Sequence, residues 1–166
     1  LPVSEPSLIE VPLFTEEFML VRPAADKDKP VPNREALRGM RLLLLEEGHC
    51  FRDQALSFCD FHSARPRELL DASSLSTLVQ MVGAGIGVTL IPEMAVAVET
   101  RSAAVAVARF EAPPPLRTIG MVWRKTNPLA NQLQQVAAEV RQSATTLRQE
   151  EQPASTPPGQ AVASVR

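Results

Sequence analysis

Two cysteines, Cys50 and Cys59, are the residues of this sequence whose type and spacing are best suited to chemistry. They stand in the segment GHCFRDQALSFCDF, in which no glycine or proline interrupts Cys50 to Phe61, so a helix is expected there. Nine residues of helix make about 2.5 turns, which would hold the two sulfur atoms on opposite faces with Cα atoms about 13 Å apart. A disulfide requires Cα atoms within roughly 7 Å. The segment therefore cannot be helical and bridged at once, and a redox switch needs this incompatibility.

Cys50 is the cysteine expected to react first, because it stands where the helix would begin, with His49 and Arg52 beside it. A helix N-terminus and nearby cations both favour the thiolate over the thiol. A thiolate attacks peroxide to give a sulfenic acid, onto which a second thiol can condense. Cys50 is thus the predicted peroxide-reactive residue and Cys59 the resolving one. Asp53, in the same first turn, would orient Arg52 or the helix amides.

Spacing alone leaves other interpretations of the two cysteines open. Most cysteines are small buried hydrophobic residues. A zinc site has four candidate ligands in His49, Cys50, Cys59 and His62, and the last two are three residues apart, as chelation on a helix needs. However, neither CxxC nor HxxxH spacing occurs, so no metal is expected. A cysteine hydrolase would need a base oriented by a third group, which spacing cannot locate.

The rest of the sequence alternates strand and helix patterns, which indicates an α/β fold. Asn33, Ser73 or Ser74, and Asn127 followed by Pro128 are expected to begin helices. The second and third of these helices should each have one apolar face, formed by Leu75, Leu78, Val79 and Val82 in the second and by Leu129, Leu133, Val136, Ala137 and Val140 in the third. The predicted helices other than the cysteine segment span residues 34–40, 74–85 and 128–140, and the predicted strands span residues 7–14, 17–22, 41–45, 88–91, 103–110 and 117–123. The run 41–45 is apolar throughout, which is typical of a buried parallel strand.

Composition limits the possible functions. With 166 residues, 45% of them hydrophobic, the chain can form one domain or two small lobes. No stretch approaches the roughly 20 apolar residues of a membrane span. The net charge of −2 and the absence of a Lys/Arg cluster argue that the chain does not bind DNA by itself. Because it begins with Leu1 and has no signal segment, we expect a piece of a longer cytoplasmic chain.

Three motifs resemble one known family. EEGHCFRDQALSFC resembles the sensor segment of the hydrogen-peroxide-sensing branch of the LysR-type transcriptional regulators. SLSTLVQMVGAGIGVTLIP resembles the effector-domain signature of the wider family, and LRTIGMVWR followed by NPLANQL continues the match, which covers roughly Ile9 to Arg141. The resemblance implies a periplasmic-binding-protein-like type II fold, in which crossover strands join two α/β lobes.

The resemblance also implies roles for particular residues. Cys50 would react with peroxide and Cys59 would be its disulfide partner, with no cofactor. Arg117 matches an arginine near the reactive sulfur that would stabilise the thiolate. In that family, oxidation refolds the cysteine segment, changes the dimer arrangement and activates transcription of antioxidant genes. The further positions carried over are His49, Arg52 and Asp53, which flank the reactive residue, and Thr77, Ala84 and Gly85, in the helix and turn that would back the pocket.

The implied organisation is incomplete in this sequence. Residues 18–117 would be a nearly complete second lobe, residues 1–17 and 118–148 a remnant of the first lobe, and residues 149–166 a disordered tail. The DNA-binding helix-turn-helix of the family is absent from the sequence, so DNA would be bound only through that missing part. The expected partners are hydrogen peroxide, a second copy of the chain in a dimer or tetramer formed through both lobes, and RNA polymerase. The expected function is that of a regulator, not an enzyme.

Three other functions compete with the peroxide-sensing regulator. A LysR-type effector domain could bind a small organic metabolite, with the cysteines incidental. A thiol peroxidase would turn peroxide over continuously, although nothing in the sequence resembles a peroxidase motif. A zinc-binding module is the third.

Overall fold

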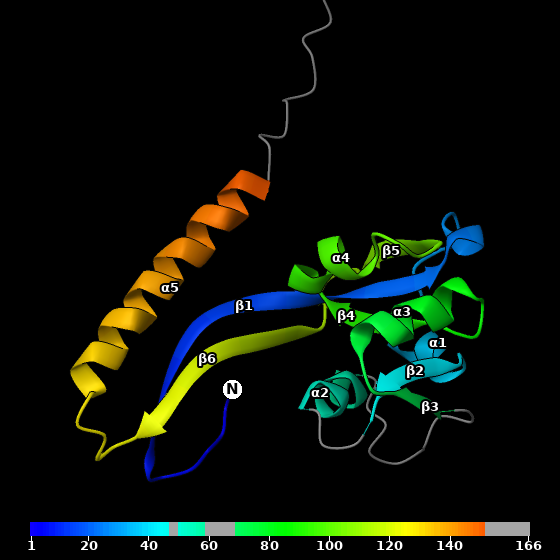
Figure 1. The fold of residues 1–166 in the computed structure, drawn as a ribbon. Coiled ribbons are helices and arrows are strands. Elements are labelled where there is room, and N and C mark those ends of the chain that lie inside the picture. Colours follow the sequence, from blue (N-terminus) through cyan, green and yellow to red (C-terminus); the bar gives the residue numbers. More distant parts are fainter. Residues whose placement is uncertain (47–49, 59–68, 152–166) are drawn as a thin grey trace, which may run out of the picture. The chain divides into compact units, whose positions relative to one another are not determined.

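The computed structural model of the chain describes residues 1–46, 50–58 and 69–151. Strands and helices alternate along most of the described chain, which confirms the predicted α/β class (Figure 1). The elements are, in order, β1 (Leu8–Pro23), the 3₁₀ turn η1 (Ala24–Asp26), α1 (Arg34–Arg38), β2 (Leu42–Leu45), α2 (Cys50–Phe58), β3 (Leu69–Ala72), α3 (Leu75–Gly83), β4 (Thr89–Pro92), α4 (Glu93–Glu99), β5 (Val105–Arg109), β6 (Leu116–Arg124) and α5 (Ala130–Glu151).

The chain divides into two compact units. One unit comprises Leu1–Phe14 and Ile119–Arg166, and the other comprises Thr15–Thr118. The strands β1 and β6 contribute residues to both units, and every other strand belongs to the second.

The 15–118 unit contains two short sheets. In one sheet β1 pairs antiparallel with β4 and with β5, so that Leu20 faces Leu90 on one side and Ala108 on the other. In the other sheet β2 and β3 run parallel, with Leu44 opposite Asp71. A parallel bridge from Leu42 leads from β2 towards the start of β4.

The core of this unit forms around β2 and α3. All four leucines of β2 are buried, as a strand covered on both faces requires, and this confirms the predicted buried strand. Leu78, Val79 and Val82 of α3 are fully buried and lie on the one apolar face that the sequence periodicity predicted.

Helix starts follow the capping pattern. The Asn33 side chain accepts a hydrogen bond from the backbone N of Ala36 at 2.8 Å, and Ser74 Oγ accepts one from the backbone N of Thr77 at 3.2 Å. Ser74 rather than Ser73 is therefore the cap of α3. Asn127 Oδ1 accepts from the backbone N of Leu129 at 2.9 Å, but a turn follows and α5 begins only at Ala130.

The observed elements differ from the predicted ones in three ways. The two strands predicted over 7–14 and 17–22 are one continuous strand, β1, because no glycine, proline or turn residue separates them. The strand β3 and the helix α4 were missed, since a four-residue strand and a seven-residue helix give little periodicity. Helix α5 continues to Glu151, three residues into the predicted tail, and the remainder of that tail lies outside the described residues.

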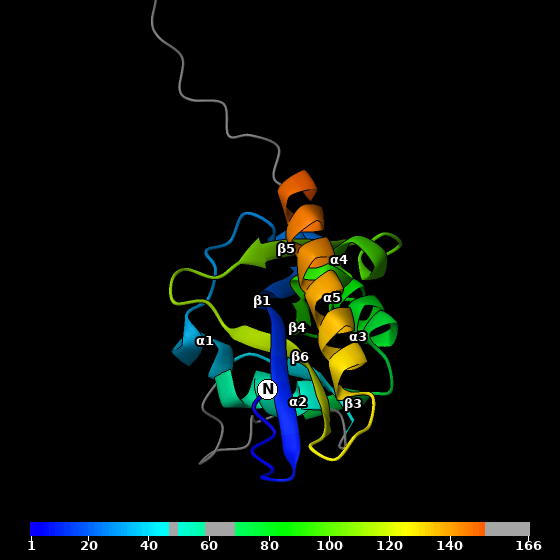
Figure 2. The same ribbon diagram turned by 90° about the vertical axis from the view of Figure 1, so that its left-hand side faces the viewer.

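The other unit is built around α5 and its parts of β1 and β6 (Figure 2). Trp123 and Ala137 are buried there, and Arg141 Nε on α5 donates to the backbone oxygen of Pro12 on β1 at 2.7 Å. The apolar stripe predicted for this helix is largely exposed, and only Ala137 of it is buried. The exposed apolar residues of the stripe and its continuation are Leu129, Val136, Val140 and Leu147.

Candidate functional site

The helix α2 carries the predicted reactive cysteine at its first residue. It begins at Cys50 and ends at Phe58, one residue before Cys59. The Cα atoms of its first and last residues are separated by about 12 Å of helical rise. His49 and Cys59 lie outside the described residues. A bridge between the two cysteines would require the described part of α2 to lose its helical form.

Arg52 fastens the first turn of α2 to the two parallel strands. Its side chain is largely buried, and Nη1 donates to the backbone oxygen of Leu45 at 2.8 Å and to Asp71 Oδ1 at 2.5 Å. These partners lie on β2 and β3, so one guanidinium holds the start of the helix against both strands. No local pattern indicated Asp71 as this partner, because the parallel pairing of β2 and β3 brings it to Arg52.

Asp53 has a different position from the one expected. The carboxylate that pairs with Arg52 is Asp71, while Asp53, the next residue along the helix, is exposed. An acidic side chain in the first turn still interacts favourably with the helix dipole.

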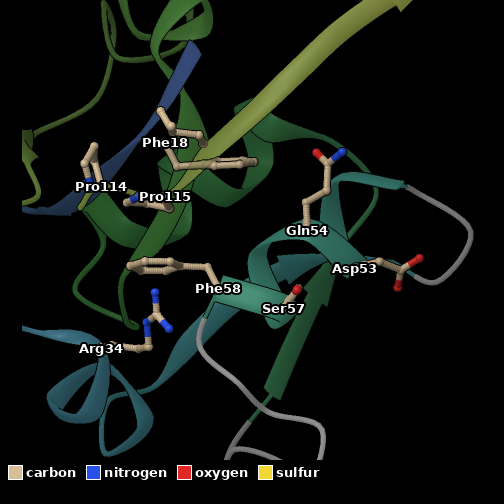
Figure 3. A pocket seen from close by; sticks show the side chains of 9 residues that line it. Phe18, Arg34, Asp53, Gln54, Ser57, Phe58, Pro114 and Pro115 are labelled. Atoms are coloured by element: carbon tan, nitrogen blue, oxygen red, sulfur yellow. The ribbon is translucent and has the colours of Figure 1, made fainter. Parts of the chain in front are cut away.

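One face of α2 lines an open pocket of about 490 Å³ (Figure 3). Phe58, at the end of the helix, lies between the ring of Phe110, 5.4 Å away between centroids, and the guanidinium carbon of Arg34, 4.8 Å from its ring centre. The buried Oε1 of Gln54 has no hydrogen-bond partner within the described part of the chain. The lining residues are Phe18, Arg34, Asp53, Gln54, Ser57, Phe58, Pro114, Pro115 and Leu116. Since Asp53, Gln54, Ser57 and Phe58 belong to α2, the pocket in this form depends on the helix.

Arg117 is held by an acidic residue that the sequence analysis did not single out. Its Nε donates to Glu16 Oε1 at 2.7 Å, and its Nη2 lies 2.6 Å from the same oxygen. Glu16 is only 3% exposed although it is charged. The guanidinium carbon of Arg117 also lies 5.9 Å from the ring centre of Phe18, which lines the pocket. A glutamate so close to the buried apolar run 18–21 of β1 was the available sign of such a pair.

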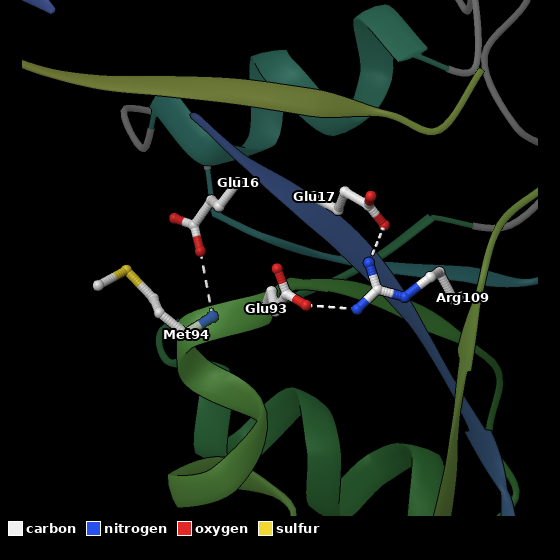
Figure 4. Close-up of polar contacts among 5 residues, drawn as sticks. All are labelled: Glu16, Glu17, Glu93, Met94 and Arg109. Carbon is white, nitrogen blue, oxygen red and sulfur yellow. Dashed lines mark hydrogen bonds and ion pairs between the residues drawn. The ribbon is translucent and has the colours of Figure 1, made fainter. Parts of the chain in front are cut away.

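Glu16 also contacts helix α4. Its Oε2 accepts a hydrogen bond from the backbone N of Met94 at 3.1 Å, while the neighbouring Glu17 binds Arg109, which in turn binds Glu93 of α4 (Figure 4). The hydrogen bond from Arg109 to Glu93 raises the pKa of the arginine above its ordinary value, so this ion pair keeps its positive partner throughout the accessible pH range. Two adjacent glutamates of β1 therefore fasten the start of α4.

The remaining predicted positions lie on α3. Thr77 is in the first turn, where its hydroxyl lies 2.9 Å from Ser74 Oγ, and Ala84 and Gly85 follow the last turn. Gly85 has a φ of 78°, the left-handed conformation that closes a helix and that other residues rarely adopt. These residues occupy opposite ends of α3, and none of them lines the pocket beside α2.

The zinc hypothesis receives no support from the residues that the structure covers. Among residues 1–46, 50–58 and 69–151, no group of three or more His, Cys, Asp or Glu side chains could hold a metal ion. Three of the four ligands considered, His49, Cys59 and His62, lie outside those ranges.

No helix within the described residues has the length and apolar character needed to cross a membrane.

Comparison with known proteins gives consistent matches. Residues 1–145 match the LysR substrate binding domain. The chain is 44% identical over 147 residues to a probable hydrogen peroxide-inducible genes activator of Streptomyces viridosporus, an alignment that covers 86% of this chain and 47% of the relative. It is 43% identical over 140 residues to the DNA-binding transcriptional dual regulator OxyR of Escherichia coli K12, covering 81% of this chain and 45% of the relative. The chain thus spans less than half the length of these curated relatives.

Solved structures agree with the sequence matches. The reduced form of the OxyR regulatory domain from Pseudomonas aeruginosa superposes with a TM-score of 0.70 at 35% identity, covering 85% of this chain and 69% of that one. A hydrogen-peroxide-bound cysteine-to-serine mutant of OxyR from Corynebacterium glutamicum superposes with a TM-score of 0.78 at 31% identity, covering 88% of this chain and 48% of that one.

Proposed function

Since this chain belongs to the LysR substrate-binding domain family, we propose that it is the hydrogen-peroxide-sensing regulatory part of a transcription regulator and not an enzyme. The observation that carries the proposal is the helix α2, which begins at Cys50 and ends one residue before Cys59. The relatives named as peroxide-inducible activators, 43–44% identical, support it. The same relatives argue against the metabolite-binding alternative. The predicted LysR-type effector fold is confirmed by the family match and the superposed regulatory domains.

The proposed reaction consumes one peroxide and two thiols. The Cys50 thiolate attacks one peroxide oxygen, the S–O bond forms as the O–O bond breaks, and the products are a sulfenic acid and, after proton uptake, water. The Cys59 thiol then attacks the Cys50 sulfur, the S–S bond forms, and the sulfenic oxygen leaves as a second water. Peroxide is reduced and the thiol pair is oxidised, so no further reductant or cofactor enters the signal.

The structural consequence follows from the contacts of α2. Before the two cysteines can meet, the helix must unwind. Unwinding would move residues beside Arg52, which joins α2 to β2 and β3, and would withdraw Phe58 from Phe110. Closing so short a loop with a disulfide contributes about 2.5–3 kcal/mol, comparable to these few contacts, so the change can remain local.

The roles of the surrounding residues are part of the same proposal. Arg117, with His49, would favour the Cys50 thiolate, since nearby cations lower the energy of the charged form. Arg52 would secure the helix start through its pair with Asp71, and Asp53 through its interaction with the helix dipole. Thr77, Ala84 and Gly85 would support the rear of the reaction site from the two ends of α3.

We also propose the organisation of the longer protein. Residues 18–117 would be the second lobe, with residues 1–17 and 118–148 part of the first, and the division of the described chain at residues 14/15 and 118/119 supports this. DNA binding would come from a helix-turn-helix outside this sequence. Assembly as a dimer or tetramer, contact with RNA polymerase and action in the cytoplasm follow from the same relationship.

A titration with peroxide tests the proposal. One equivalent should link the Cys50 and Cys59 peptides, detected as the loss of two hydrogen masses by mass spectrometry, and Cys50→Ser should abolish the link. Far-ultraviolet circular dichroism should show a loss of helix in the wild-type chain only. A folded chain whose cysteines remain unlinked and unreactive would contradict the proposal. Continuous peroxide turnover with added reductant would indicate a peroxidase instead.

A further inference from the structure

We propose that Met94, the methionine of α4, is a second peroxide-reactive side chain of this domain and that its oxidation acts on Arg117. The oxidation itself is independent of the proposed function, whereas its effect on Cys50 rests on it. Met94 would respond to sustained peroxide, because a neutral thioether is a weaker nucleophile than a thiolate.

Exposure distinguishes Met94 from the other methionines. The chain has five, all within the described residues. Met94 is 60% exposed, whereas Met19 is buried and the remaining three are intermediate. Peroxide therefore reaches the Met94 sulfur more readily than any of the others. The three intermediate methionines are Met40, Met81 and Met121.

The position of Met94 is fixed by two contacts. Its backbone N donates to Glu16 Oε2 at 3.1 Å, and its Sδ accepts from Arg117 Nη2 at 3.6 Å. Figure 4 shows the first of these contacts and the side chain extending from the start of α4. Arg117 Nη2 also lies 2.6 Å from Glu16 Oε1, so the thioether and the carboxylate share one guanidinium nitrogen. An exposed methionine is thus held against the arginine to which the proposed function gives a role.

Oxidation of the Met94 thioether needs no reactant other than peroxide. A lone pair of Sδ attacks a peroxide oxygen, the O–O bond breaks, the S–O bond forms, and one water leaves. Sulfur is oxidised to the sulfoxide and peroxide is reduced. A thioether is a weak hydrogen-bond acceptor, while a sulfoxide is polar and its oxygen accepts strongly. Because Sδ is already 3.6 Å from Nη2, the added oxygen comes within hydrogen-bond reach of Arg117.

The sulfoxide would compete with the existing partners of Arg117. A stronger hydrogen bond to residue 94 would shift the guanidinium relative to Glu16, its present partner, and so weaken the support that Arg117 is proposed to give the Cys50 thiolate. The expected result is slower reaction of Cys50 with peroxide. Sulfoxides of methionine are reduced by a dedicated class of reductases, so the effect is reversible. Met94 would therefore reduce the response of the domain when peroxide persists.

The first experiment asks whether Met94 is oxidised selectively. The chain carrying Cys50→Ser and Cys59→Ser is treated with excess peroxide, and the gain of one oxygen atom is followed in each methionine peptide. Met94 should be oxidised before Met81 and Met121, which serve as internal controls. Equal rates for the three would overturn the inference. Because both cysteines are absent, this result does not depend on the sensor proposal.

The second experiment asks whether the sulfoxide acts on Cys50. The wild-type chain is oxidised by peroxide, its disulfide is reduced with dithiothreitol, and the rate of a second reaction with peroxide is measured. The rate should fall about threefold relative to the first round, since a partly exposed charge contributes little more than this. It should recover after treatment with methionine sulfoxide reductases. Met94→Leu should show equal rates in the two rounds.

The outcomes separate the two proposals. A similar loss of rate in Met94→Leu, or no loss in the wild-type chain with Met94 oxidised, overturns the action on Arg117. If Cys50 and Cys59 fail to link even in the first round, the sensor proposal fails, and the peptide mapping still decides whether Met94 is the favoured site of oxidation.

Discussion

The guanidinium of Arg52 and the carboxylate of Asp71 lie 2.5 Å apart and join the first turn of α2 to the strand β3. The pair connects the residues next to Cys50 with the parallel sheet, and Arg52 is largely buried. The stability of α2, the helix that would unwind in the proposed switch, therefore depends partly on a residue 19 positions away in sequence.

Asp71→Asn should destabilise the reduced chain by about 1–3 kcal/mol, because the largely buried guanidinium loses its charged partner. Urea unfolding of the reduced protein measures this change. The control is Asp53→Asn, which removes an exposed carboxylate from the same helix turn without touching the pair, and should change the stability by less than about 0.5 kcal/mol. Equal effects of the two substitutions would contradict the assigned role of Asp71.

Phe58→Ala should weaken the helical form of the segment, because the ring packs against Phe110 and beneath Arg34. The expected loss of stability in the reduced state is about 2–3 kcal/mol, less than for a fully buried ring. If the contacts are lost on oxidation, the disulfide becomes favoured by about 20 mV for each kcal/mol. Equilibration with a glutathione redox buffer measures the potential, and Ser57→Ala, on the same helix, is the control. An unchanged potential with a lowered stability would show that Phe58 keeps its contacts after oxidation.

Glu16→Gln should cost about 2–4 kcal/mol, since a buried carboxylate that holds Arg117 and the backbone of Met94 becomes neutral. A double-mutant cycle with Arg117→Gln isolates the pair. The coupling between the two residues should exceed about 1 kcal/mol. Additive effects in denaturant unfolding would mean that the pair contributes little.

Ser74→Ala should lower the stability by about 1 kcal/mol, because α3 loses the side chain that accepts from the backbone N of Thr77. Ser73 is its exposed neighbour and provides a matched control, since Ser73→Ala leaves the cap intact and should be nearly neutral. Thermal unfolding of the two variants side by side distinguishes them. A larger loss for Ser73→Ala would reassign the cap.

Local chemistry made part of this structure predictable. The caps at Asn33 and Ser74, the apolar face of α3 and the buried strand β2 each follow from residues within one or two turns of one another. The start of α2 at Cys50 was likewise indicated by an uninterrupted segment. These features were predicted because their causes lie within the segment itself.

The other features of the structure could not be predicted, because they depend on contacts between residues far apart in the sequence. Glu16 and Arg117 are 101 residues apart, and Arg52 and Asp71 are paired only because β2 and β3 run parallel. The strand β3 carries an aspartate in an apolar run that gives no clear periodicity. No local pattern shows which acidic residue reaches which arginine, so the partners of the predicted site residues were found only in the structure.

The complete burial of β2 has a consequence for hydrogen exchange in β2 and in the adjoining helix α2. Its backbone amides should exchange with deuterated water only through global unfolding, whereas those of the adjoining α2 can exchange through an excursion confined to that helix. A mild denaturant series followed by peptide-level exchange would then show two separate free energies of opening. The exchange of β2 would report the free energy of global unfolding, and the exchange of α2 would report the lower free energy of local opening of that helix.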